Sequence, residues 1–107
     1  MPSIELVVQN PTGLHARPAM LFARAAGACA ARLTIENLDR EGPPVDAKSL
    51  ILVLSKGVER GHRIRLTAEG PDADEALGSL RELVESGIGE GAEGAKGAWD
   101  NARDDPG

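Results

Sequence analysis

The stretch Asn10-Pro11-Thr12-Gly13-Leu14-His15-Ala16-Arg17-Pro18-Ala19-Met20 marks the point where an extended segment gives way to a helix. The turn-forming residues 10–13 end the preceding extended segment. Because Pro18 has no backbone N–H, it fits the first turn of a helix and not its middle. The helix is therefore expected to begin near His15 or Ala16. The His15 imidazole would then lie beside the unpaired N–H groups and the positive dipole end of that helix.

A helix N-terminus of this kind attracts anions, and phosphate is the commonest biological choice. Imidazole is a nucleophile whose neutral form is available near pH 7. The guanidinium of Arg17 offers paired donors to phosphate oxygens. His15 and Arg17 together therefore suggest an imidazole that carries a phosphoryl group. On these residues alone, however, a lone histidine near a helix start is more often a capping or surface residue, and that interpretation stays open.

The length and composition bound the class of protein. A chain of 107 residues is enough for one domain with a modest core, and one Phe, one Trp and no Tyr make that core aliphatic. Cys29 is the only cysteine, which excludes an internal disulfide and Cys-based metal spacing, and we expect it to be a small buried residue. We predict no metal and no cofactor. No apolar run approaches the ~20 residues that span a bilayer, and the first residues lack the basic-then-apolar pattern of a signal peptide. These absences predict a cytoplasmic protein without membrane insertion.

The charge is unevenly distributed along the chain. The formal net charge of −5 argues against nucleic acid as a partner. Residues 1–88 hold ten Lys/Arg against twelve Asp/Glu, whereas residues 89–107 hold two against five. We therefore expect one domain over 1–88 and an acidic, Gly-rich, disordered tail over 89–107, in which Trp99 is the only candidate anchor and is expected to be idle.

Hydrophobic periodicity predicts most of the elements. Apolar residues alternate with polar ones in three strand-like segments, and they recur at steps of three and four in two helix-like segments. The expected strands are 3–9, 32–38 and 62–69, with a short edge segment at 43–45, and the expected helices are 16–28 and 72–86. The buried face of the first helix should carry Ala19, Phe22, Ala23 and Ala26. This order predicts an α+β domain with helices packed on one face of a mainly antiparallel sheet.

The apolar run 49–55 is ambiguous, because periodicity does not separate a buried strand from a short helix there. As a helix capped by Ser49 or Asp46, it would leave several of its large apolar side chains exposed, which indicates a partner surface.

Two single residues also carry predictions. Asp72 is expected to cap the last helix with Glu75 three residues later, and His62 is expected to be an exposed surface histidine.

Three segments resemble the HPr family, the histidine phosphocarriers of the bacterial sugar phosphotransferase system. Residues 12–19 (Thr-Gly-Leu-His-Ala-Arg-Pro-Ala) are similar to the phosphohistidine motif, and 47–51 (Ala-Lys-Ser-Leu-Ile) are similar to the family's Ala-Lys-Ser segment. Residues 67–72 with 75–77 are similar to the junction between the last strand and the last helix. The resemblance covers residues 3–88.

The resemblance implies an open-faced β-sandwich with the element order βαββαβα. Its four-stranded antiparallel sheet would have the order 1-4-2-3 and would be covered on one face by three helices. The run 49–55 then becomes a short helix. The implied function is a phosphoryl relay, in which enzyme I takes the group from phosphoenolpyruvate and passes it to Nδ1 of His15. Phosphorylated His15 would then pass it to enzyme IIA proteins for sugar uptake.

The resemblance also assigns roles to single residues. Arg17 would stabilise the phosphate, and a partner-binding surface would be formed by Met20, Arg24, Leu50, Ile51 and Leu54. Ser49 matches the serine that an HPr kinase/phosphorylase modifies in many Gram-positive members, although an ordinary N-cap serine is the alternative. We expect a monomer. Lys56 departs from the family pattern, which usually has an apolar residue there.

Two other functions remain open on the sequence. One is an HPr-like relay that serves a nitrogen-regulatory or dihydroxyacetone-kinase branch with the same chemistry. The other is a regulatory binding module that acts through Ser49 and the apolar surface without any relay.

Overall fold

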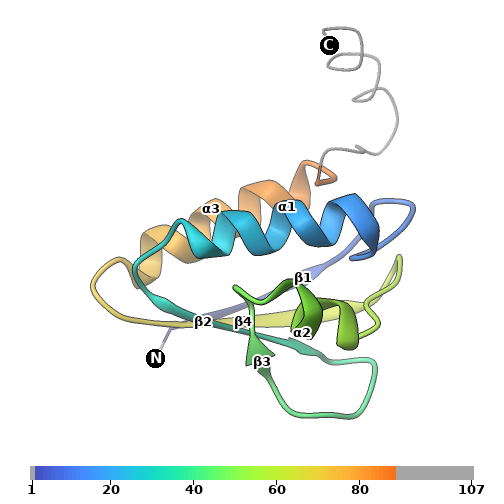
Figure 1. Cartoon of the computed structure of the whole chain (residues 1–107), viewed down its shortest axis with the longest axis horizontal. Coiled ribbons are helices and arrows are strands. Elements are labelled where there is room, and N and C mark those ends of the chain that lie inside the picture. The colour runs from blue at the N-terminus through green and yellow to red at the C-terminus, as the bar shows by residue number, and fades with distance from the viewer. Residues whose placement is uncertain (1, 89–107) are drawn as a thin grey trace, which may run out of the picture.

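The computed structural model describes residues 2–88 as four strands and three helices (Figure 1). The elements are, in chain order, β1 (Ser3–Val7), α1 (Ala16–Gly27), β2 (Arg32–Asn37), β3 (Val45–Asp46), α2 (Leu50–Ser55), β4 (Arg63–Glu69) and α3 (Ala73–Glu85). The predicted order of strands and helices is thereby confirmed.

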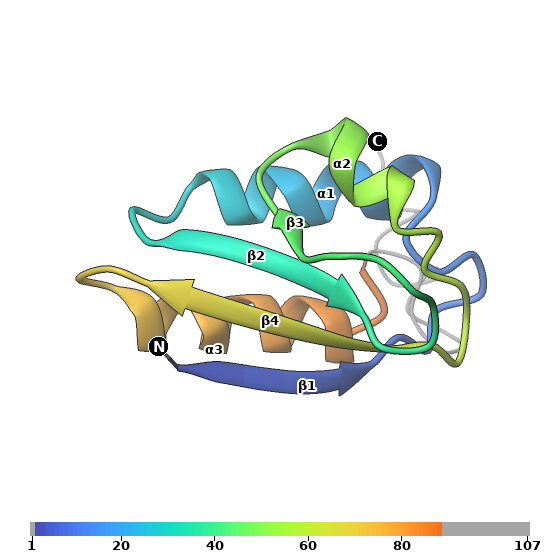
Figure 2. The ribbon, with the colours of Figure 1, turned by 90° about the horizontal axis from the view of Figure 1, so that it is seen from below.

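The four strands form one antiparallel sheet with the order β1-β4-β2-β3. The long β4 lies in the middle and pairs with β1 from Ser3↔Thr67 to Val7↔Arg63, and with β2 from Arg32↔Glu69 onward. Helices α1 and α3 lie side by side and run in opposite directions over one face of this sheet, while α2 contacts α1 and β3 (Figures 1 and 2). Within residues 2–88, the other face carries no helix, so the predicted open-faced α+β sandwich is confirmed.

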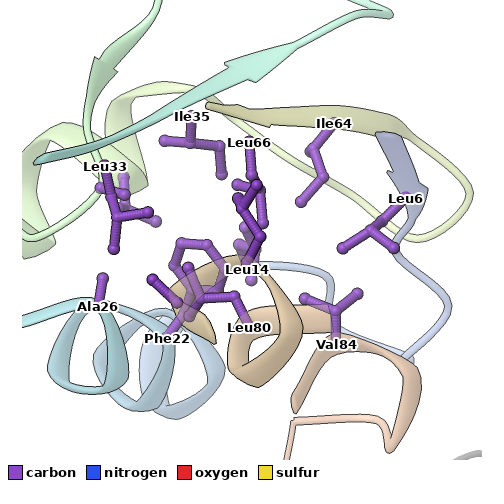
Figure 3. Close-up of a cluster of buried hydrophobic side chains, with 14 of the residues drawn as sticks. Leu6, Leu14, Phe22, Ala26, Leu33, Ile35, Ile64, Leu66, Leu80 and Val84 are labelled. Atoms are coloured by element: carbon purple, nitrogen blue, oxygen red, sulfur yellow. The ribbon is translucent and has the colours of Figure 1, made fainter. Parts of the chain in front are cut away.

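The core fills the space between the sheet and the helices (Figure 3). Alternate strand residues such as Leu33, Ile35, Ile64 and Leu66 point to the covered face and are 0–1% exposed. The helices supply apolar stripes with a 3.6-residue period, and α1 buries the four residues that its pattern predicts, together with Pro18.

Several predicted boundaries move by one or two residues. The structure ends β1 at Val7, α1 at Gly27 and β2 at Asn37, and it begins β4 at Arg63. The ambiguous run resolves as a helix, since the Ser49 hydroxyl accepts a hydrogen bond from the Leu52 backbone N–H at 3.2 Å. As a strand, the run 49–55 would need a partner of similar length, and β3 has only two residues. As a helix, it satisfies its backbone hydrogen bonds internally.

The predicted capping box of the last helix is wrong. Asp72 occupies the N-cap position of α3, but its side chain makes no cap hydrogen bond. Its carboxylate instead accepts a hydrogen bond from the Ala30 backbone N–H at 3.0 Å, which ties the start of α3 to the loop between α1 and β2. Cys29, in that same loop, was expected to be buried and is only half-buried, with its thiol directed at the Ala25 carbonyl at 3.6 Å.

The predicted tail and Trp99 lie outside the described residues, so the division into a 1–88 domain and a tail stays a prediction. Across residues 2–88, no helix is long and apolar enough to cross a membrane. Nor do three or more His, Cys, Asp or Glu side chains gather within this range in a way that would hold a metal ion.

Candidate functional site

His15 stands at the N-cap of α1 in extended backbone geometry, with φ −124° and ψ 155°. Its side chain is exposed and makes no capping hydrogen bond to the helix. The imidazole therefore lies at the start of a twelve-residue helix whose first N–H groups carry partial positive charge. This is the position that the sequence pattern predicts, although the role of His15 stays a prediction.

The residue before His15 is anchored in the core. Leu14 is fully buried between the sheet and the helices (Figure 3), and its backbone N–H donates to the Val58 carbonyl at 2.9 Å. Leu14 thus fixes the polypeptide at the point from which the His15 side chain projects.

The turn before Leu14 is closed by a buried asparagine. The Asn10 side-chain amide donates to the Gly13 carbonyl at 2.7 Å, and the Gly13 N–H donates back to the Asn10 carbonyl at 3.1 Å. Gly13 has φ +64°, and a Cβ placed there would lie 2.4 Å from the Val58 oxygen. Only glycine fits this close approach of two backbones.

Ala16, between His15 and Arg17, has φ +50°, a left-handed conformation that non-glycine residues seldom adopt. Such a conformation costs roughly 1–2 kcal/mol for an alanine. The strain lies directly at the start of α1, next to the candidate nucleophile.

The predicted partner-binding residues lie on two helices that touch. Arg17, Met20 and Arg24 are exposed on α1 and recur at steps of three and four, so they share one face. Helix α2 contacts α1 and exposes nearly all its large apolar side chains: Leu50 and Leu54 are 38% exposed, Leu52 is 39% and Ile51 is 76%. An apolar surface of this density is typical of a protein contact.

Ser49 is half-buried at the N-cap of α2, and its hydroxyl is already engaged with the Leu52 N–H. The capping interpretation therefore holds for the unmodified side chain, while the regulatory interpretation stays a prediction.

His62 was expected to be an exposed surface residue, and this prediction is wrong. The ring is half-buried, and its Nδ1 atom lies 3.0 Å from the Glu59 backbone N and 3.2 Å from Asn37 Nδ2. A signal was present in the sequence, because Asn37 follows Leu33 and Ile35 at the buried phase of β2 and is 1% exposed. A buried polar side chain needs partners, and the pattern of β2 pointed to that need.

Fold and site together define a class of protein, namely a small open-faced α+β domain that presents an exposed histidine at the start of its first helix. The family model described as the PTS HPr component phosphorylation site matches residues 2–86. The chain therefore belongs to the HPr family of phosphocarriers of the phosphotransferase system, as its motifs predict.

Individual relatives agree with this assignment. The chain is 44% identical to phosphocarrier protein HPr of Streptomyces coelicolor, over 73% of this chain and 82% of that protein. The crystal structure of HPr-C-His from Thermoanaerobacter tengcongensis has a TM-score of 0.78 and 39% identity, and the match covers 84% of this chain and 98% of the other. The chain is also 42% identical, over 84% of its length, to the multiphosphoryl transfer protein of Salmonella typhimurium, of which it spans only about a quarter (24%).

Proposed function

We propose that this protein accepts a phosphoryl group on Nδ1 of His15 from enzyme I, with phosphoenolpyruvate as its origin, and passes it to enzyme IIA proteins. The observation that carries the proposal is the exposed His15 ring at the extended N-cap of α1, with Arg17 two residues along the chain. Family membership supports the same chemistry.

In the accepting step, the Nδ1 lone pair attacks phosphorus while the bond from phosphorus to the donor breaks, and the bonding electrons stay on the donor. In the donating step, the N–P bond breaks and its electrons return to the imidazole. Phosphoryl transfer depends mainly on positioning and on charge stabilisation. The start of α1 supplies both, since its N–H dipoles contribute roughly 0.3–1 kcal/mol toward a nearby anion.

Partner recognition is proposed to use the exposed surface of α2 together with Met20 and Arg24 on α1. The apolar side chains of α2 would be covered when a partner docks, which removes apolar area from water. Arg24 would add positive charge toward an acidic partner.

Donor and acceptor specificity distinguishes the sugar pathway from the other branches. The chain, phosphorylated by enzyme I, is mixed with a sugar-specific enzyme IIA, a nitrogen-regulatory acceptor or a phosphoryl-accepting dihydroxyacetone-kinase component. We expect rapid transfer to the sugar-specific acceptor. Exclusive transfer to either of the others would reassign the branch and leave the chemistry intact.

Arg17 is expected to matter for rate rather than for stability. In Arg17→Ala, single-turnover acceptance from phosphorylated enzyme I should slow by about 10²-fold, as when one charge-stabilising donor is removed. Arg81→Ala, which removes an exposed arginine of α3, serves as the matched control and should react at the wild-type rate. Equal rates for the two variants would contradict the role of Arg17.

Ser49 is proposed as a site for an HPr kinase/phosphorylase. A phosphate there would replace the hydroxyl that caps α2 and would place about two negative charges next to the apolar surface. Incubation with such a kinase and ATP should add one acid-stable phosphate, which Ser49→Ala should abolish. Ser49→Ala should also lower the free energy of unfolding by about 1 kcal/mol through the lost cap. No acid-stable phosphate on the wild-type chain would end the regulatory proposal and leave the relay untouched.

A further inference from the structure

Three connections lie at the end of the molecule where α1 begins (Figure 2). They are the turn 9–15 that carries His15, the loop 38–44 between β2 and β3, and the loop 56–62 between α2 and β4. The Val58 carbonyl links the first and the third, because it accepts the Leu14 N–H. Whatever fixes the loop 56–62 therefore also fixes the backbone next to His15.

A buried asparagine joins the second and third connections. The side-chain Oδ1 of Asn37 accepts the Asp39 backbone N–H at 2.9 Å, which assigns the orientation of the side-chain amide. Its Nδ2 group then donates to the Lys56 carbonyl at 3.0 Å and has a second N–H directed at His62 Nδ1. Both polar atoms of the Asn37 side chain, Oδ1 and Nδ2, are thus engaged.

His62 completes this cluster from the far end of the same loop. Its Nδ1 atom accepts the Glu59 backbone N–H, so Nδ1 carries no proton and the proton of the neutral ring is on Nε2. The bond closes the turn 59–62 together with the His62 N–H, which donates to the Glu59 carbonyl at 2.9 Å.

Lys56 adds a further tie between these loops. It is 8% exposed, and its ammonium group donates to the Pro43 carbonyl at 2.5 Å. An apolar side chain at this position could not make this contact. The cluster of Asn37, Lys56 and His62 therefore fastens the loop 56–62 to the loop 38–44.

We infer that His62 is a positioning residue for His15, acting through the loop 56–62 and the Leu14–Val58 hydrogen bond. This inference rests on the proposed relay function. The acceptor atom Nδ1 holds the Glu59 N–H and the Asn37 amide in place. Glu59 follows Val58 directly, so these contacts also fix the Val58 carbonyl. That carbonyl accepts the N–H of Leu14, the residue before the phosphoryl acceptor His15. The ring itself does not take part in the transfer.

The test compares three variants of the full chain, each first shown by urea titration to be folded under the assay conditions. His62→Leu removes the acceptor and keeps a similar volume. His62→Asn keeps an acceptor, because the asparagine Oδ1 takes the place of Nδ1. Arg60→Ala, an exposed change in the same loop, is the matched control. Two quantities are measured: the single-turnover rate of acceptance from phosphorylated enzyme I, and the hydrogen-exchange rate of the Leu14 amide.

We expect His62→Leu to slow acceptance by about tenfold, because small displacements of a reacting group cost this much or more. Its Leu14 amide should exchange faster by a similar factor. His62→Asn should recover both rates to within about twofold, since it restores the buried acceptor. A purely structural role of the ring would lower stability without this rescue pattern.

Wild-type rates in His62→Leu would overturn the inference, as would an Asn variant as slow as the Leu variant. If the wild-type chain accepts no phosphoryl group, the relay proposal fails. The hydrogen-exchange rate of the Leu14 amide then tests by itself whether His62 fixes the backbone at Leu14. Faster exchange in the Leu variant than in the Asn variant would then support it, and equal exchange would overturn it.

Discussion

Replacing His15 with alanine should abolish phosphoryl acceptance while leaving the fold intact. The side chain is exposed and does not cap α1, so its removal leaves no cavity and breaks no hydrogen bond to the helix. The free energy of unfolding should change by less than about 0.5 kcal/mol, as is usual for an exposed position. Incubation with enzyme I and phosphoenolpyruvate, followed by intact-mass measurement, should find no added phosphoryl group.

The matched control for this prediction is Arg60→Ala, which removes an exposed side chain outside α1. It should be phosphorylated to the same extent as the wild-type chain. Undiminished labelling of His15→Ala would place the phosphoryl group elsewhere, whereas loss of folding in His15→Ala would make its inactivity uninformative. The urea titration of both variants separates these two outcomes.

The second large effect is expected for Gly13→Ala, and here it concerns the scaffold of the site. The added Cβ would lie 2.4 Å from the Val58 oxygen and 2.7 Å from the Glu59 Cα, so two backbone segments would have to separate. Together with φ +64°, this should cost about 3 kcal/mol, from left-handed strain and overpacking. The separation would also stretch the Leu14–Val58 hydrogen bond, so acceptance by His15 should slow in the fraction of protein that remains folded.

Gly61→Ala provides the comparison for Gly13→Ala. Gly61 has φ +91°, but nothing lies within 4 Å of a Cβ built there, so this variant bears only the backbone strain. Its free energy of unfolding should fall by about 1–2 kcal/mol, and its rate of phosphorylation should exceed that of Gly13→Ala. If urea titrations find Gly13→Ala to be no less stable than Gly61→Ala, the close packing of the two loops is not what requires glycine.

The sequence predicted the sheet and the two long helices because their periodicities are strong and local. Strand residues such as Leu33 and Ile35 alternate with polar neighbours, and Phe22 recurs with small apolar residues at helical spacing. The boundaries shifted by a residue or two because strand ends depend on pairing. For example, Val8 still bonds to the His62 carbonyl beyond the end of β1.

Local hydrophobic periodicity did not predict helix α2. Its run of aliphatic residues fits a buried strand as well as a short helix, and only the family motif favoured the helix. The physical cause lies in the tertiary structure, since β2 already pairs with β4 on one side and with the two-residue β3 on the other. The run then forms a helix whose exposed side chains make the candidate partner surface.

For the site, the sequence predicted the place of His15 and missed what supports it. The position of His15 follows from turn residues and a proline that are local signals. The supporting contacts of Val58, Asn37 and His62 join segments that are 19 to 44 residues apart along the chain (from the pairs 37–56 and 14–58), and no short motif records them. The predicted side-chain cap by Asp72 was wrong for the same reason, because its carboxylate accepts a hydrogen bond from a residue 42 positions away and not from its own helix.

The most direct test of the relay is a mass measurement on the full wild-type chain, before and after incubation with enzyme I and phosphoenolpyruvate. The account predicts one added phosphoryl group that is lost in acid, is stable in base and maps by fragmentation to His15. An unchanged mass, or a single acid-stable phosphate at another residue, would contradict the claim that His15 carries the phosphoryl group.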